Sequence, residues 1–79
     1  MPDPGSYGVY RVQVGSYAAP QNAQIAAESL VRAGLSPAYE QYGQIWRVVL
    51  PGIPAQQLTF VAQQLGLLGI KEAWIRQEG

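Results

Sequence analysis

The first clear pattern along the chain is an alternation of apolar and polar residues from Tyr10 to Val14. A period of two is typical of a strand with one face in a core and the other outside. We therefore predict a strand from Val9 to Val14, ended by Gly15-Ser16, because glycine adopts backbone angles that a strand does not use. Its inward residues would be Tyr10, Val12 and Val14, and its outward residues Arg11 and Gln13.

Two later stretches repeat their apolar residues every three or four positions, which is the spacing of an amphipathic helix. The first begins near Pro20, a residue suited to the first helical turn, and would end at Gly34. The second opens with Pro54 and would end within Gly66–Gly69. The predicted apolar stripes are Ala23, Ala26, Ala27, Leu30 and Val31 in the first helix, and Leu58, Val61, Ala62 and Leu65 in the second.

Three further strands are predicted between and after these helices. The second strand spans Ala38–Tyr42, and a hairpin turn at Gly43-Gln44 leads into the third strand, Ile45–Leu50, which Pro51-Gly52 ends. The fourth strand spans Lys71–Gln77. Alternation turns Trp46, Val48, Leu50, Ala73 and Ile75 inward, and Arg47, Val49, Glu72, Trp74 and Arg76 outward.

The element order is therefore β-α-β-β-α-β, and Tyr10-Arg11-Val12 in the first half is echoed by Trp46-Arg47-Val48 in the second. Two similar halves predict an α+β, ferredoxin-like (RNP-like) sandwich. Right-handed crossovers then place both helices on one face of a four-stranded antiparallel sheet in the order 4-1-3-2. We expect one domain over residues 9–77, a disordered Pro/Gly/Ser-rich linker over 1–8 belonging to a longer chain, and a short tail at 78–79.

The amino-acid composition limits the catalytic and metal-binding chemistry available to the chain. The 79 residues include no Cys and no His, so the chain lacks a thiolate and the commonest metal ligand and general base. Glu28, Glu40 and Glu72 fall on three different elements, so we expect no catalysis, no cofactor and no metal. The net charge is zero and no apolar run approaches the ~20 residues of a membrane span, so we expect neither nucleic acid nor direct membrane insertion.

Two helices cover only one side of a sheet, so the other side must face water or a partner. To the outward residues above, the second strand is expected to add Tyr39 and Gln41, with the small Ala38 turned inward. An exposed Trp74 beside Gln and Arg would form a stacking platform surrounded by hydrogen-bond donors. The two central strands present no aromatic ring on this side and the chain is not basic, which argues against an RNA-binding module.

The motif Tyr10–Tyr17, the Ala-rich helix ending in Ala33-Gly34 and the hairpin into Trp46-Arg47-Val48 together resemble the SPOR domain family, over about Val9–Arg76. The resemblance implies a bacterial, non-catalytic module that binds peptidoglycan glycan strands lacking stem peptides. It also implies a place in the periplasm or cell envelope, often at the division septum. After the third strand the family often has Gly-Pro-Phe, whereas this chain has Pro51-Gly52-Ile53.

The resemblance places glycan contacts on the sheet and on the turn after the first strand, where Gln13 and Ser16 occupy the motif positions. Trp74 would match an aromatic residue of the fourth strand. We add the hypothesis that lactyl carboxylates, free once stem peptides are removed, pair with Arg11 or Arg47. The full set of candidate glycan-binding residues is Gln13, Ser16, Trp74, Arg11, Arg47, Tyr39, Gln41 and Arg76.

Other interpretations stay open at this point. Trp46 alternates in phase with the core residues Val48 and Leu50, so packing in the core is favoured over ligand contact. Ser16 could shape the turn as well as contact the glycan. Arg11 and Arg47 could form a solvated face next to Glu72, and Trp74 could be covered by the tail or by a second copy. The alternative functions are a dimerising or small-ligand regulatory domain and, further off, RNA binding; the isolated domain is expected to be a monomer.

Overall fold

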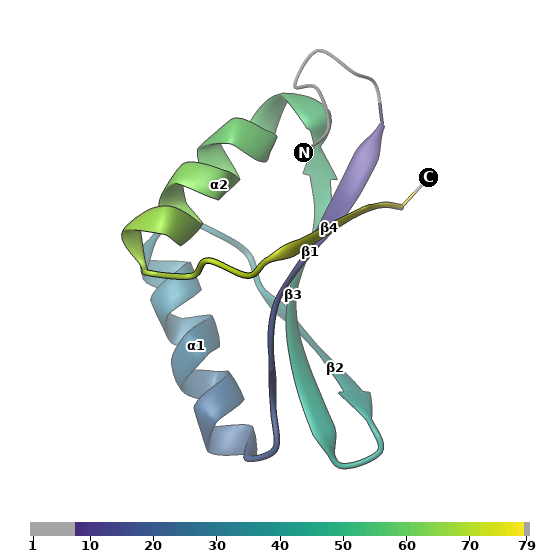
Figure 1. The fold of residues 1–79 in the computed structure, drawn as a ribbon, viewed down its shortest axis with the longest axis vertical. Coiled ribbons are helices and arrows are strands. Elements are labelled where there is room, and N and C mark those ends of the chain that lie inside the picture. Colours follow the sequence, from purple (N-terminus) through teal and green to yellow (C-terminus); the bar gives the residue numbers. More distant parts are fainter. Residues whose placement is uncertain (1–7, 79) are drawn as a thin grey trace.

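The computed structural model describes residues 8–78, which fold as β-α-β-β-α-β (Figure 1). The strands pair antiparallel in the order β2-β3-β1-β4, so the predicted fold class and strand order are confirmed. The expected linker lies outside the described residues except for Gly8, whose carbonyl accepts a hydrogen bond from Ala55. The elements are β1 (Val9–Tyr17), α1 (Pro20–Arg32), β2 (Ala38–Tyr42), β3 (Ile45–Pro54), a 3₁₀ turn (Ala55–Gln57), α2 (Leu58–Leu67) and β4 (Trp74–Gln77).

Both helices lie on the same side of the sheet, and the β2–β3 hairpin projects at one end of the molecule (Figure 1). The core fills the space between these two layers. Its fully buried aliphatic residues come from the central strands and both helices, as in Val12, Leu30, Leu50 and Leu58. Strands β1 and β3, at the centre of the sheet, thus bury one face and leave the other uncovered.

Strand β1 does not end at Gly15-Ser16 as the sequence predicted, because an extra residue in the strand replaces the expected turn. Gln13 pairs with Val49 and Gly15 pairs with Val48, so two steps along β1 match one step along β3. This is a β-bulge at Val14. Beyond it the alternation changes phase: Tyr17, opposite Trp46, packs against the core, and Ser16, opposite Arg47, turns to the uncovered side.

A second bulge lets β3 run on to Pro54, past the Pro51-Gly52 pair that was expected to end it. Tyr10 pairs with Ile53 and Val12 with Leu50, so β3 carries one residue more than β1 here. Gly52 has a φ of 66°, which favours glycine, and its N–H donates to the Glu78 carboxylate at 2.7 Å. Glu78, expected to start a free tail, therefore holds this bulge, and its own N–H donates to the carbonyl of Val9.

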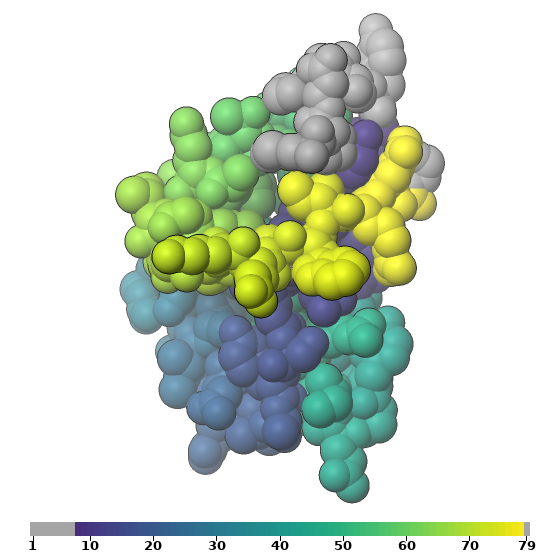
Figure 2. All heavy atoms as spheres, in the orientation of Figure 1, coloured from purple at the N-terminus to yellow at the C-terminus, as the bar shows by residue number. Residues whose placement is uncertain are grey.

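Both helices end close to the predicted positions, but α2 begins at Leu58, after the 3₁₀ turn, and not at Pro54 as predicted. After α1, the N–H of Leu35 donates to the Leu30 carbonyl and that of Gly34 to Val31, which is the Schellman arrangement. Leu35 is buried beside Leu30, whereas Val31, predicted in the apolar stripe, is exposed. Ala62 of α2 is likewise exposed, and β4 begins only at Trp74. The C-terminal segment (yellow) crosses the face of the molecule next to β1 (purple) in Figure 2.

The bulge predicts a steric requirement for glycine at position 15. A Cβ there would lie 2.7 Å from the Tyr17 hydroxyl oxygen and 3.0 Å from its Cζ. We expect Gly15→Ala to lower the free energy of unfolding by about 1–3 kcal/mol, as overpacking does, and to cost much less in a Tyr17→Leu background. Urea unfolding of the four proteins of this double-mutant cycle measures the coupling.

Gly66→Ala is the matched control, because no atom lies within 4 Å of a Cβ at that helical position. It should raise the free energy of unfolding by about 0.5–1 kcal/mol. An equal cost of Gly15→Ala in both backgrounds would contradict the contact with Tyr17.

Candidate functional site

The side of the sheet away from the helices is a continuous surface, called here the open face. The register places three rows across it: Trp74–Gln13–Val49–Ala38, Arg76–Arg11, and Ser16–Arg47–Glu40. Tyr42 and Ile45 form a further pair at the hairpin end. The structure therefore brings together six of the predicted site residues, namely Arg11, Gln13, Ser16, Arg47, Trp74 and Arg76.

Two predicted site residues, Tyr39 and Gln41, do not belong to this surface. They pair with Val48 and Trp46 on the helix side of the sheet, and Ala38, expected inward, lies opposite Val49 on the open face. The Tyr39 ring meets the Trp46 ring edge-on, with centroids 6.5 Å apart. The prediction was wrong because β2 is short and largely polar, so its own alternation does not reveal which face is buried.

The position of Val49 also differs from the prediction. It was expected to be exposed at the centre of the open face, yet it is only 1% exposed although it is not part of the core between sheet and helices. Its ladder neighbours are Gln13 and Ala38. The apolar side chain of Val49 is therefore covered by the longer polar side chains of the open face.

A shallow hollow of about 190 Å³ opens at the β1–β4 end of this face, lined by Arg11, Gln13, Trp74, Ile75 and Arg76. Trp74 is 75% exposed, and Gln13 lies directly across the ladder from it. A large apolar ring left in water next to an amide and two guanidinium groups is an arrangement that suits a ligand with both apolar faces and hydrogen-bonding groups. The site thus has a flat ring and polar donors at its edge.

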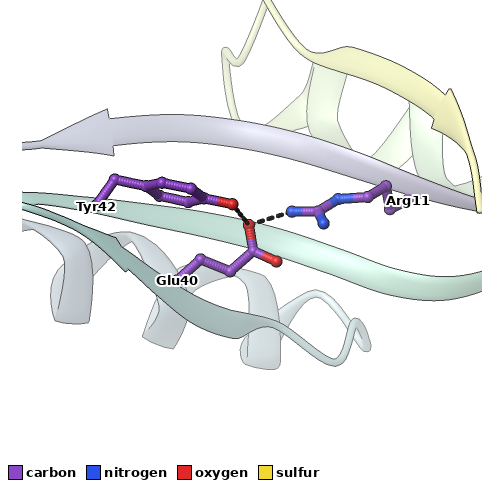
Figure 3. A network of polar contacts seen from close by, with 3 residues as sticks. All are labelled: Arg11, Glu40 and Tyr42. Atoms are coloured by element: carbon purple, nitrogen blue, oxygen red, sulfur yellow. Dashed lines mark hydrogen bonds and ion pairs between the residues drawn. The ribbon is translucent and has the colours of Figure 1, made fainter.

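An ion pair crosses the centre of the open face. The Arg11 guanidinium and the Tyr42 hydroxyl, the latter at 3.4 Å, both donate to the same carboxylate oxygen of Glu40 (Figure 3). The Arg11 and Glu40 side chains are 17% and 29% exposed, so the pair is partly shielded from water. The hydrogen bond from Arg11 holds the pKa of Glu40 below its ordinary value, and the same bond raises the pKa of Arg11.

Arg47 contacts the same group of residues through the ring of Tyr42. Its guanidinium carbon lies 4.1 Å from the centre of the Tyr42 ring, a cation–π contact, and its buried Nε has no hydrogen-bond partner within residues 8–78. Glu40, not Glu72, is therefore the acidic neighbour of both arginines, since Glu40 also lies opposite Arg47 in the ladder. Sequence analysis missed Glu40 and Tyr42, and the i, i+2 spacing that puts them on one face of β2 was the signal available.

Other features of the described residues add little chemistry. Residues 8–78 hold no group of three or more acidic side chains placed to bind a metal ion. None of their helices has the length and apolar character to cross a membrane. A larger hollow of about 470 Å³ lies between α2 and β4, walled by apolar residues with Lys71 as its charged member.

The Arg11–Glu40 pair predicts a pH dependence of stability. Because the folded-state pKa of Glu40 is lowered, its contribution is present above the unfolded pKa of about 4.3 and is lost as the pH falls through the folded value. Glu40→Gln should lower the free energy of unfolding by about 0.5–1 kcal/mol at pH 7, and this difference from wild type should be smaller at about pH 3, where more of Glu40 is protonated in the folded protein.

Urea unfolding at both pH values measures this effect, with Glu28→Gln on the exposed surface of α1 as the control that changes little at either pH. A cost of Glu40→Gln that is the same at pH 3 as at pH 7 would show that packing, and not charge, is responsible.

The sequence profile of the SPOR domain matches residues 6–77. The fold is similar to the solution structure of the peptidoglycan binding domain of the B. subtilis cell wall lytic enzyme CwlC, with a TM-score of 0.71, 19% sequence identity and 100% of each chain covered. No curated protein matches the chain. Since the profile spans nearly the whole sequence, the chain belongs to the SPOR domain family.

Proposed function

We propose that this SPOR domain is a non-catalytic module that binds peptidoglycan through its open face, and that it prefers glycan strands from which stem peptides have been removed. The observation that carries the proposal is Trp74, which stays 75% exposed beside Gln13 and a hollow. Large exposed aromatic rings are uncommon without a partner. The family and its similarity in fold to a peptidoglycan-binding domain point to the same class of ligand.

The apolar faces of sugar rings supply what Trp74 lacks in water. Stacking one ring on the indole buries apolar area worth on the order of 1–2 kcal/mol at about 25 cal/mol per Å². The neighbouring Gln13 side chain donates and accepts hydrogen bonds at once, which matches the acetamide groups of amino sugars. Exposed Ser16, brought to the open face by the bulge at Val14, offers a hydroxyl for further sugar hydroxyls.

Charge favours an anionic ligand. The open face holds Arg11, Arg47 and Arg76 against the carboxylate of Glu40 and that of Glu78, which also acts on Arg11, although the whole chain has a formal net charge of zero. Glycan strands freed of stem peptides expose lactyl carboxylates, which are good partners for guanidinium groups. In the cell such a module would bring a larger protein to the cell envelope, and to the division septum if denuded strands are concentrated there.

The proposal predicts the outcome of a sedimentation assay with purified insoluble sacculi, before and after a partial amidase digestion (stripped sacculi) that removes stem peptides but leaves enough cross-links to keep the sacculi insoluble. Wild type should sediment more strongly with stripped sacculi. Trp74→Ala and Gln13→Ala should each reduce binding by about 5–30-fold, corresponding to about 1–2 kcal/mol of lost contact.

Tyr39→Ala is the matched control, because Tyr39 is another half-exposed aromatic residue but lies on the helix side of the sheet. It should bind as wild type does, provided that circular dichroism shows every variant folded. Wild type remaining in the supernatant with both kinds of sacculi would overturn the proposal. A protein mass that then rises with concentration and falls on Trp74→Ala would favour a dimer contact at the open face.

A further inference from the structure

The arginines of the open face differ in how their charges are already used. Arg11 donates to Glu40, and the pair is partly shielded, so its charge is largely balanced within the protein. A carboxylate arriving at Arg11 would have to displace Glu40 or lie beside another negative charge, and like charges in close contact are unfavourable. Arg11 is therefore poorly placed to provide the main charge for an anionic ligand.

Arg47 is also engaged. Its guanidinium group lies over the Tyr42 ring, its Nε is buried, and its ladder neighbour is Glu40. The negative charge of Glu40 makes the binding of a second anion at Arg47 less favourable. Moving this side chain toward a ligand would break the cation–π contact. We therefore treat Arg11, Glu40 and Tyr42 (Figure 3), together with Arg47 over the Tyr42 ring, as one network whose side chains already contact one another.

Arg76 is the exception. It is exposed on the edge strand β4, and within residues 8–78 no side chain forms a hydrogen bond or ion pair with it. Its ladder neighbour is Arg11, whose guanidinium group is bound to Glu40 on the other side of β1. Arg76 also lines the same hollow as Trp74 and Gln13.

We propose that Arg76 is the specificity residue that binds the free lactyl carboxylate of a denuded glycan strand, next to the sugar that stacks on Trp74. This inference rests on the proposed function. A carboxylate at Arg76 would pair with a guanidinium group that no side chain within residues 8–78 engages, on the side of β1 away from Glu40. Ligand recognition and the internal network would thus use different arginines.

The size of the hollow supports a small substituent as the occupant. Its volume of about 190 Å³ is below the roughly 300–1,000 Å³ of pockets for drug-sized ligands. It suits a lactyl group better than a peptide. A stem peptide converts that carboxylate into a neutral amide and adds bulk, so a strand carrying peptides loses both the charge and the fit.

The test separates charge from bulk by using three forms of the same teichoic-acid-free sacculi: with stem peptides, amidase-stripped, and stripped with the lactyl carboxylates then converted to neutral N-methylamides. We expect wild type to bind the stripped form about 3–10-fold more tightly than the methylamidated form, as one partly exposed charge pair would give. Arg76→Gln should bring this ratio close to one while still sedimenting with stripped sacculi.

Two variants locate the effect. The neutral replacement Arg11→Gln/Glu40→Gln should keep a ratio well above one, because it removes a balanced pair, and Arg32→Gln on exposed α1 should behave as wild type. Equal binding of wild type to stripped and methylamidated sacculi would overturn the inference and leave the proposed function standing. Loss of the ratio in the double variant but not in Arg76→Gln would assign the carboxylate to Arg11 and also overturn it. Failure of wild type to bind any form would overturn the proposed function itself.

Discussion

The surface chemistry of this domain depends on one extra residue in its central strand. A regular β1 would keep Ser16 in phase with Val12 and Val14, which face the core. The bulge at Val14 reverses that phase, so Ser16 joins Arg47 on the open face and Tyr17 turns to pack against the core. The same bulge explains how a strand rich in core residues also supplies polar groups to the open face.

The ion pair between Arg11 and Glu40 sets the electrostatics of that surface. Exposed ion pairs contribute little to stability, but this one is partly shielded and joins β1 to β2 across β3. By balancing the charge of Arg11, it leaves the β4 edge, with Arg76 and Trp74, as the part of the open face whose charge and apolar area are not satisfied within residues 8–78. The asymmetry of the face follows from the position of Glu40 on β2, far from the β4 edge.

Sequence alone predicted the elements, their order and the exposed Trp74–Gln13 pair, because those depend on clear periodicity in β1, β4 and the helices. The two bulges escaped it, since Gly15 and Pro51-Gly52 look like strand ends when the partner strand is unknown. The face of β2 was wrong for a related reason: its five residues include only small, polar and aromatic side chains. Its register is decided by β3, and that pairing brings Glu40 to the open face in place of Gln41.

The two tryptophans lie on opposite sides of the sheet and differ in how far they are buried. Trp46 packs partly against the core beside Tyr17 and helps to close the layer under the helices, whereas Trp74 stays in water on the opposite side. A chain of 79 residues buries only about 60% of its unfolded surface, so leaving a large ring exposed forgoes stabilisation that the fold could use. Placing that ring on β4, an edge strand away from the helices, limits the loss, because the core is complete without it. Binding at the open face, as proposed above, would therefore not require the packed layer beneath it to rearrange.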